Sequence, residues 1–346
     1  MLIPETAKTR VSPLPELIPA ETVMDANESF IPMPAWMAAE IAMRLADTPL
    51  NRYPDPLSAK VCELAAAYYG VRPDQVTAGC GSDELISVIV AALIPPGGRL
   101  LLSEPDFGTY RFCAEMRELV CVAQTRQNGL PDLDALGREA KEGDCVILSN
   151  PCNPTGQAAG REEMLELVRK APCLVVADEA YMDFWDQSLS GEIGRLENLI
   201  LLRTASKTVG LAGIRLGFAL TGAELTRCLR AAKLPYNVSA LTQCVGEVVY
   251  AYPDLLRENA SALFQSARKL YAALEPVVSG REGYRLTDTR ANFVLLHAPD
   301  AKALYQGLLE RGVRVRIMGN PPFLRITGGS ERDNERFIAA VKEIGS

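Results

Sequence analysis

Short apolar runs alternate with longer stretches in which apolar residues recur at helical spacing along most of the chain. The runs are bounded by turn residues, which predicts strands. Strands that alternate with helices in this way are typical of a mainly parallel α/β sheet. The predicted strands are Gln75–Ala78, Arg99–Ser103, Leu119–Gln124, Cys145–Ser149, Leu174–Ala177, Leu199–Arg203 and Leu216–Leu220. The helices predicted between them include Leu57–Tyr69, Asp83–Leu93, Tyr110–Arg117 and Glu162–Lys170.

The pattern changes after Pro235-Tyr236-Asn237. A long helical region follows from about residue 239 to 274, with a break near Tyr252-Pro253. Further strands and helices are predicted at Tyr284–Leu286, Asn292–Leu296, Leu304–Glu310, Phe323–Ile326 and Asn334–Ile344. The first thirty residues are rich in proline and irregular. We therefore expect an N-terminal arm (1–30) that joins the small domain, a large domain (31–238) and a smaller α+β domain (239–346).

Composition narrows the classes of protein that this chain can represent. Its 346 residues are 48% hydrophobic and 23% charged, as in a globular enzyme of roughly two domains. The net charge of −7 and the lack of a basic stripe argue against a nucleic-acid partner. No apolar run reaches the ~18 residues of a membrane span, so no membrane partner is expected. The N-terminus has no basic segment followed by an apolar one, so no secretory signal is predicted.

The nine cysteines and the single histidine exclude further chemistry. The cysteine count is odd and contains no C-x-x-C pair, so neither a disulfide framework nor a metal cluster is expected. A reducing cytoplasm suits this composition best. With His297 as the only histidine, a site that needs two histidines cannot form. We expect no bound metal, and we interpret His297 as a surface residue at the end of a strand.

The strongest chemical signal is the segment Thr204-Ala205-Ser206-Lys207-Thr208, which follows a predicted strand. Open α/β sheets bind ligands at this edge. A partly desolvated lysine amine becomes a nucleophile toward carbonyl groups, as Schiff-base chemistry requires. The alternative interpretation is a polar loop with solvated cations.

Three more polar segments follow predicted strands. Asp178 could cap a helix, bind a metal or pair with a protonated ring nitrogen. Prolines flank Asn153, which suits an amide aimed at one ligand atom, although the segment could be a simple turn. At Gly79-Cys80-Gly81-Ser82, the N–H groups of a helix start and the Ser82 hydroxyl could bind a phosphate, or the serine could be an ordinary helix cap.

Together these segments resemble the motifs of the fold-type-I pyridoxal-phosphate aminotransferases, in the family's order and over essentially the whole chain. Within that superfamily, Asn-Arg-Tyr-Pro-Asp-Pro (51–56), Gly-Ser-Asp-Glu (81–84), the segment 202–218 and Leu-Arg-Ile-Thr (324–327) resemble histidinol-phosphate aminotransferases. The resemblance implies a fold-type-I α/β architecture: a large domain with a mainly parallel seven-stranded sheet, and a smaller α+β domain. The implied cofactor is pyridoxal 5′-phosphate.

The resemblance also implies roles for individual residues. Catalysis would rest on Lys207, Asp178 and Tyr181. Lys207 would bind the cofactor covalently and move a proton, and Asp178 would pair with the ring nitrogen. Tyr181 and Asn153 would donate hydrogen bonds to the ring oxygen, and Phe107 would stack on the ring.

Other matches concern the cofactor phosphate and the substrate. Tyr53 resembles a tyrosine that reaches the phosphate from the neighbouring subunit, which implies a homodimer with shared active sites. Arg325 matches an arginine that binds the substrate carboxylate, and Arg316 and Asn27 are further candidates for this pocket. The residues implied to hold the phosphate within one chain are Ser82, Asp83, Thr204, Ser206 and Arg215.

The implied reaction is a ping-pong transamination of histidine biosynthesis. L-Glutamate gives up its amino group and leaves as 2-oxoglutarate, and imidazole-acetol phosphate becomes L-histidinol phosphate. The chain departs from the family's pattern on the substrate side, at 10–15, at 27–34 and in a short loop between Arg316 and Arg325. Alternatives on the same fold therefore remain: a threonine-phosphate decarboxylase of the cobalamin pathway, an aromatic amino acid aminotransferase, or a non-catalytic regulatory protein.

Overall fold

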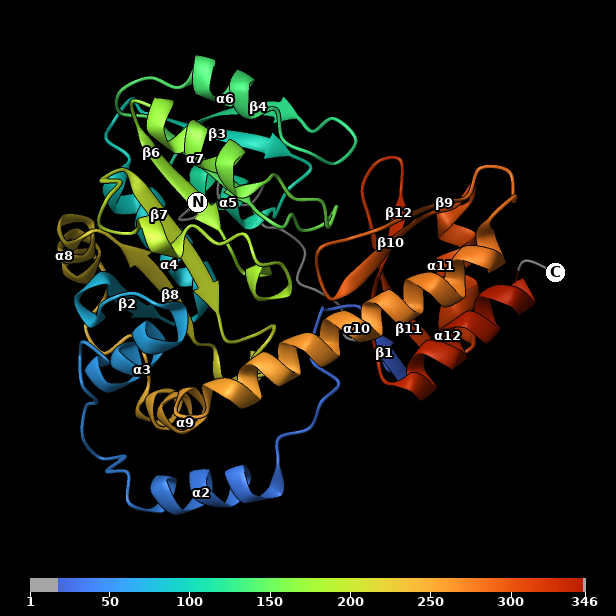
Figure 1. Cartoon of the computed structure of the whole chain (residues 1–346), viewed down its shortest axis with the longest axis horizontal. Coiled ribbons are helices and arrows are strands. Elements are labelled where there is room, and N and C mark those ends of the chain that lie inside the picture. The colour runs from blue at the N-terminus through green and yellow to red at the C-terminus, as the bar shows by residue number, and fades with distance from the viewer. Residues whose placement is uncertain (1–17, 345–346) are drawn as a thin grey trace, which may run out of the picture.

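The larger of two sheets has seven strands, in the order β2-β8-β7-β6-β5-β3-β4 (Figure 1). The structure is a computed structural model and describes residues 18–344, so the departure at 10–15 lies outside the described residues. β8 runs antiparallel to β2 and β7, and the other neighbouring strands pair in parallel. This confirms the predicted sheet. Its strands are β2 (Val76–Gly79), β3 (Arg99–Glu104), β4 (Val120–Thr125), β5 (Cys145–Ser149), β6 (Leu174–Asp178), β7 (Leu199–Thr204) and β8 (Gly217–Thr221).

The central strands are buried on both faces, which explains why they read as continuous apolar runs. In β5, Val146 and Leu148 pack into one core cluster, while Cys145 and Ile147 pack into the other. Helices cover both faces of the sheet (Figure 1). These helices are α3 (Ala59–Tyr69), α4 (Gly81–Leu93), α5 (Thr109–Met116), α6 (Leu133–Glu139), α7 (Arg161–Lys170), α8 (Ala223–Ala232) and α9 (Ala240–Tyr250). Short 3₁₀ turns lie at Pro73–Gln75, Met182–Phe184, Ser190–Glu192 and Ala212–Ile214.

A second sheet of five strands has the order β1-β11-β12-β10-β9. Helices α10, α11 and α12 pack their apolar side chains against it. The long helix α10 runs from the large sheet to this smaller one (Figure 1). The elements are β1 (Thr22–Met24), α10 (Pro253–Val278), β9 (Arg285–Thr287), β10 (Phe293–His297), α11 (Ala301–Glu310), β11 (Val313–Met318), β12 (Phe323–Thr327) and α12 (Glu331–Ile344).

The elements that were not named from the sequence include β1, β11 and the helix α2 (Ala35–Ala46). β1 pairs in parallel with β11 and so adds a strand from the N-terminal segment to the small sheet. The expected arm and domain bounds stay a prediction. Helix α2 lies apart from both sheets (Figure 1), and only Met37 and Ile41 of its side chains are buried. Between residues 18 and 344, no helix is long and apolar enough to cross a membrane.

Candidate active site

The polar motifs gather where the carboxyl ends of β5, β6 and β7 face the small sheet. Because these strands are parallel, the loops that follow them lie at one edge, where open α/β sheets bind ligands. β12 supplies Arg325 from the opposite side, and its Nη1 donates a hydrogen bond of 2.5 Å to Oδ1 of Asn153. The lysine predicted to be catalytic, Lys207, lies in the loop after β7. The site therefore spans the two sheets.

Asp178, the last residue of β6, is a buried carboxylate with no cation beside it. Its side chain accepts hydrogen bonds from the Tyr110 hydroxyl (2.7 Å) and from the backbone N–H of Ala180 (3.0 Å). Burial raises the pKa of Asp178 to about 6, because nothing nearby compensates its charge fully. Among residues 18–344, no lysine or arginine forms an ion pair with it. A ligand with a protonated nitrogen would supply the missing charge.

Tyr110 was not foreseen from the sequence. It lies on α5, three residues after Phe107, and is fully buried. The Phe107 ring meets the Tyr110 ring edge to face, with 5.7 Å between the ring centroids. The predicted stacking residue therefore lies next to the group that contacts Asp178. The only signal in the sequence for the contact between Tyr110 and Asp178 is the three-residue spacing of Tyr110 from Phe107.

Lys207 lies beside Tyr181 and the N-terminal segment. Its Nζ donates a hydrogen bond of 2.8 Å to the backbone oxygen of Ala26 and lies 6.0 Å from the centroid of the Tyr181 ring. The Tyr181 hydroxyl accepts a hydrogen bond of 2.8 Å from Nδ2 of Asn27. The side-chain oxygen of Asn27 in turn accepts from the Thr327 hydroxyl (3.2 Å). Asn27 thus contacts Tyr181 directly, and its substrate-binding role stays a prediction.

The start of α4 forms a cradle that an anion would fit. No side chain caps this helix, and Arg215 reaches over its first turn. Nη2 of Arg215 donates to Oδ2 of Asp83 (2.9 Å), and Nη1 donates to the Ser206 hydroxyl (3.4 Å). Gly81 has φ +78°, and a Cβ there would lie 2.7 Å from Nη2 of Arg215. Uncapped N–H groups and a guanidinium together attract a phosphate.

The other predicted phosphate residues border this cradle. Ser82 is in the first turn of α4, and Gly217 on β8 lets the two elements approach closely. A Cβ at Gly217 would lie only 2.4 Å from the Ser82 nitrogen. Thr204 accepts a hydrogen bond of 3.1 Å from the Ser206 N–H, so its hydroxyl shapes the loop before Lys207.

Tyr53, the residue predicted to reach a phosphate from the neighbouring subunit, is exposed on the surface. Its side chain is 81% exposed, and its ring stacks on that of Tyr236 with 4.5 Å between the centroids. In the part of the chain that the structure describes, it has no contact with the cradle around Arg215. The predicted role of Tyr53 in the phosphate site of a neighbouring subunit stays a prediction.

Two arginines of the small sheet have side chains on the same face of that sheet. Arg325 and Arg316 are directly opposite one another on β12 and β11. Arg325 is 6% exposed and also donates to the backbone oxygen of Asp25 (2.7 Å), whereas its Nε has no partner among the described residues. Burial lowers the pKa of Arg325, and the charge of Arg316 acts in the same direction. Neither arginine forms an ion pair within residues 18–344, so the pair suits an anionic substrate.

These groups fit the donor set that pyridoxal phosphate requires. The buried carboxylate of Asp178 has no cationic partner in the described part of the chain, and the cradle around Gly81 and Arg215 suits a phosphate. Lys207 supplies an amine beside them. Two observations carry this fit. The negative charge of Asp178 is not balanced by a cation among the described residues, and a side chain at position 81 would fill the space beside Arg215.

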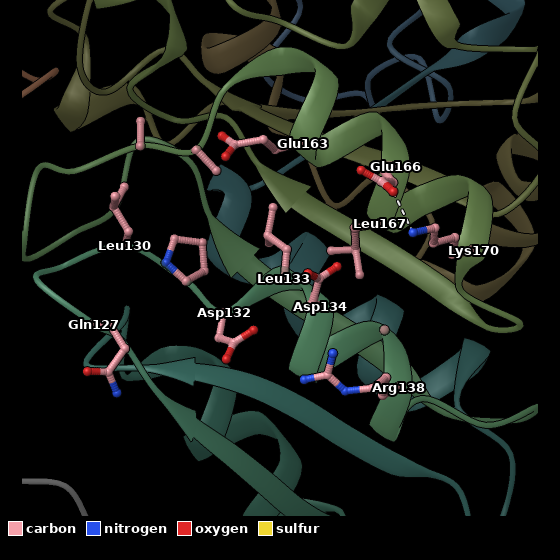
Figure 2. A pocket seen from close by; sticks show the side chains of 14 residues that line it. Gln127, Leu130, Asp132, Leu133, Asp134, Arg138, Glu163, Glu166, Leu167 and Lys170 are labelled. Atoms are coloured by element: carbon pink, nitrogen blue, oxygen red, sulfur yellow. Dashed lines mark hydrogen bonds and ion pairs between the residues drawn. The ribbon is translucent and has the colours of Figure 1, made fainter.

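A separate cavity of about 780 Å³ lies between α6 and α7 (Figure 2). Asp134, Glu163 and Glu166 line it together with Lys170, which pairs with Glu166. Carboxylates outnumber cations on its walls, so the cavity does not suit a phosphate. None of the residues predicted from the sequence to act in catalysis or binding lines it.

Comparison with known proteins agrees with this geometry. Residues 21–341 match the family model "Aminotransferase class I and II". The histidinol-phosphate aminotransferase of Clostridium kluyveri is 36% identical over 94% of this chain and 93% of its own, and that of Chromobacterium violaceum is 36% identical over 92% and 91%. The crystal structure of the Sinorhizobium meliloti histidinol-phosphate aminotransferase with pyridoxal 5′-phosphate is 24% identical, covers 94% of this chain and 91% of its own, and has the same fold (TM-score 0.85). The chain belongs to the class I and II aminotransferases.

Proposed function

We propose that this enzyme transfers an amino group from L-glutamate to imidazole-acetol phosphate, giving 2-oxoglutarate and L-histidinol phosphate. The observation that carries the proposal is the cross-strand pair of Arg325 and Arg316, which form no ion pair within residues 18–344 and of which Arg325 contacts Asn153. Such a pair can bind the carboxylate of one substrate and the phosphate of the other. The curated relatives of about one third identity, which are named histidinol-phosphate aminotransferases, support this choice.

Pyridoxal 5′-phosphate is the cofactor of this enzyme. When bound, it supplies an electron sink that stabilises negative charge at the substrate Cα. Lys207 would hold it covalently and, once freed, would move a proton from the substrate Cα. Asp178 would keep the ring nitrogen protonated. Asn153 and Tyr181 would hold the ring oxygen, and Phe107 would pack on the ring.

The start of α4 would hold the phosphate of the cofactor. Ser82 and Asp83 offer backbone N–H groups there, and Ser206 and Arg215 offer side-chain donors. Arg215 would exchange its contact with Asp83 for one with the phosphate. Thr204 supports this loop through its hydrogen bond from the Ser206 N–H.

A half-reaction screen tests the substrate. The holoenzyme is mixed separately with L-histidinol phosphate, aromatic amino acids and threonine phosphate, and the visible absorbance of the lysine-bound cofactor is followed. We expect L-histidinol phosphate to bleach it, and L-glutamate to yield 2-oxoglutarate. Arg325→Gln should raise the KM for both substrates roughly 10- to 100-fold, because a charge-assisted hydrogen bond contributes about 1.5–3 kcal/mol. Release of carbon dioxide from threonine phosphate, or bleaching by aromatic amino acids alone, would contradict the proposal.

The active enzyme is a homodimer in which Tyr53 reaches the phosphate site of the partner subunit. Apolar side chains are exposed on α2, just after it and beside Tyr236, and a second subunit would cover them. Trp36 and Met43 are on α2, and Leu50 follows this helix; their exposed fractions are 51%, 66% and 67%. Leu234, next to the Tyr236 that stacks on Tyr53, is 74% exposed.

Tyr53→Phe is expected to weaken cofactor binding, because it removes the hydroxyl that reaches the phosphate of the partner subunit. The variant keeps the ring that stacks on Tyr236 and removes only the hydroxyl. The Kd of the apoprotein for pyridoxal phosphate should rise about tenfold, the value of one hydrogen bond to a charged group. Tyr252→Phe, which removes the donor to Glu40, is the matched control and should leave this Kd unchanged. Two results would refute the shared site: a normal cofactor Kd in Tyr53→Phe, or full activity in a sample that light scattering shows to be monomeric.

We also place the enzyme in the cytoplasm. All nine cysteines are free in the structure, and Cys80 is exposed. Free thiols persist in a reducing compartment. Cell fractionation with a marker enzyme of the cytoplasm tests this location.

A further inference from the structure

We propose that Asp106 is a positioning residue that fixes both Phe107 and Asn153, so that one buried carboxylate aligns two sides of the cofactor site. Asp106 lies in the turn between β3 and α5, and its side chain is 3% exposed. It contacts neither Lys207 nor Asp178 directly. The inference rests on the proposed roles of Phe107 and Asn153.

Both oxygens of Asp106 accept hydrogen bonds from the site loops. Oδ1 accepts from the backbone N–H of Phe107 (2.8 Å) and from the hydroxyl of Ser149. The Ser149 hydroxyl in turn accepts from the backbone N–H of Asn153 (3.1 Å). Oδ2 accepts from the Ser149 N–H (3.1 Å). Asp106 therefore connects directly to Phe107 and, through one hydroxyl, to Asn153.

Arg126 fixes the position of the Asp106 carboxylate. Its Nη2 lies 2.6 Å from Oδ2 of Asp106, and both side chains are almost completely buried. The same guanidinium donates to the backbone oxygens of Ser103 (3.0 Å) and Ser149 (3.3 Å). Arg126 thus joins the ends of β3, β4 and β5 under the site. The cost of desolvating two buried charges cancels most of what their attraction contributes, so this ion pair adds little to stability. A role in positioning the loops of Phe107 and Asn153 explains its location better.

Every partner of Asp106 is a donor, which makes the charge at this position essential. Asp106→Asn keeps the size but turns one oxygen into an NH₂ group that must face Arg126, Phe107 or Ser149. At least one of these contacts then becomes a donor–donor contact. The loop that carries Phe107 or the one that carries Asn153 would shift, while Lys207 keeps its own contacts.

Asp144 offers a matched control at the other end of the same strands. Its carboxylate is also buried, with a side chain that is 4% exposed, and it pairs with Arg99 at 2.7 Å. It also accepts from the backbone N–H groups of Arg99 (3.1 Å) and Lys141 (2.9 Å). Asp144→Asn therefore disturbs a similar buried pair far from the site. Any effect of lost stability alone should be shared by the two variants.

The test measures the Kd of each apoprotein for pyridoxal phosphate and the visible circular dichroism of each holoenzyme, which reports how the bound cofactor is oriented. We expect Asp106→Asn to raise the Kd at least about tenfold and to change the dichroism. Ser149→Ala, which removes only the link to Asn153, should raise the Kd roughly 3- to 10-fold and change the dichroism in the same sense. Asp144→Asn should leave both readouts unchanged at a temperature where it is folded.

Two outcomes would overturn the inference and can be told apart with Asn153→Ala. If Asn153→Ala changes both readouts but Asp106→Asn and Ser149→Ala behave like Asp144→Asn, Asp106 is only a structural residue. If Asn153→Ala itself leaves both readouts unchanged, the proposed role of Asn153 is wrong and the inference fails with it.

Discussion

Lys207→Ala is expected to lose the covalently bound cofactor and to reduce kcat roughly 10²- to 10⁴-fold, the range for removing a group that transfers a proton. Among residues 18–344, the contacts recorded for Nζ of Lys207 are the backbone oxygen of Ala26 and the Tyr181 ring, so its loss should leave the fold intact. Borohydride reduction of the holoenzyme followed by peptide mass spectrometry checks the assignment. The label should appear on Lys207 and should be absent from the variant.

Lys233 provides the control for this experiment. Its Nζ is held by the backbone oxygen of Pro56 (2.8 Å) and by Oδ1 of Asn237 (2.6 Å), and burial lowers its pKa. A low pKa favours a nucleophilic amine, so Lys233 is the lysine most able to compete. Lys233→Met should keep the label on residue 207. A label on Lys233, or on any other lysine of Lys207→Ala, would contradict the assignment.

The parts of the structure that follow from local sequence were predicted, and those that depend on distant partners were not. The strands of the large sheet could be predicted because they are buried on both faces and therefore form continuous apolar runs. β11 alternates apolar residues with Arg314 and Arg316, which is the pattern of a strand with one buried face, so it could have been predicted; it was overlooked because only continuous apolar runs were interpreted as strands. β1 has only three residues and forms through its pairing with β11, so its own sequence gives no signal.

The same division holds for the candidate site. Lys207, Asp178 and Asn153 follow predicted strands, so their meeting at one edge could be inferred from topology. The position of Asp106 could not, because its partners Arg126 and Ser149 are 20 and 43 residues away in sequence. Its importance depends on a hydrogen-bond network that only the packed structure reveals. The contact of Tyr110 with Asp178 also joins residues far apart, 68 positions along the chain.

Asp178→Asn is expected to reduce kcat/KM roughly 10²- to 10³-fold, because a neutral amide cannot keep the ring nitrogen protonated. Removing one partner of a buried ion pair costs about 3–5 kcal/mol, which sets this scale. The Asn side chain has nearly the same shape and can still accept the hydrogen bond from Tyr110. Steady-state kinetics at saturating cofactor check the result. Near-normal activity would mean that Asp178 does not pair with the ring nitrogen.

The same variant should make the apoprotein more stable at neutral pH, which distinguishes this carboxylate from a structural one. Folding raises the pKa of Asp178 from its ordinary value of 3.8 to about 6, so the folded protein loses stability as the pH rises from about 4 to 6. The cost is roughly 3 kcal/mol at pH 7. Asp178→Asn removes this cost but loses one hydrogen bond of about 1 kcal/mol, so the net gain should be about 1–2 kcal/mol.

Urea unfolding of the apoproteins at pH 5 and pH 8 measures this effect, and Asp144→Asn is a control of opposite sign. Burial acts to raise the pKa of Asp144, but the hydrogen bonds from Arg99 and the backbone outweigh it and the pKa is lowered. Asp144 therefore stabilises the fold above its ordinary pKa, and its removal should destabilise the protein at pH 8. If Asp178→Asn also destabilised the apoprotein at pH 8, its carboxylate would not be an uncompensated charge that awaits a cationic ligand.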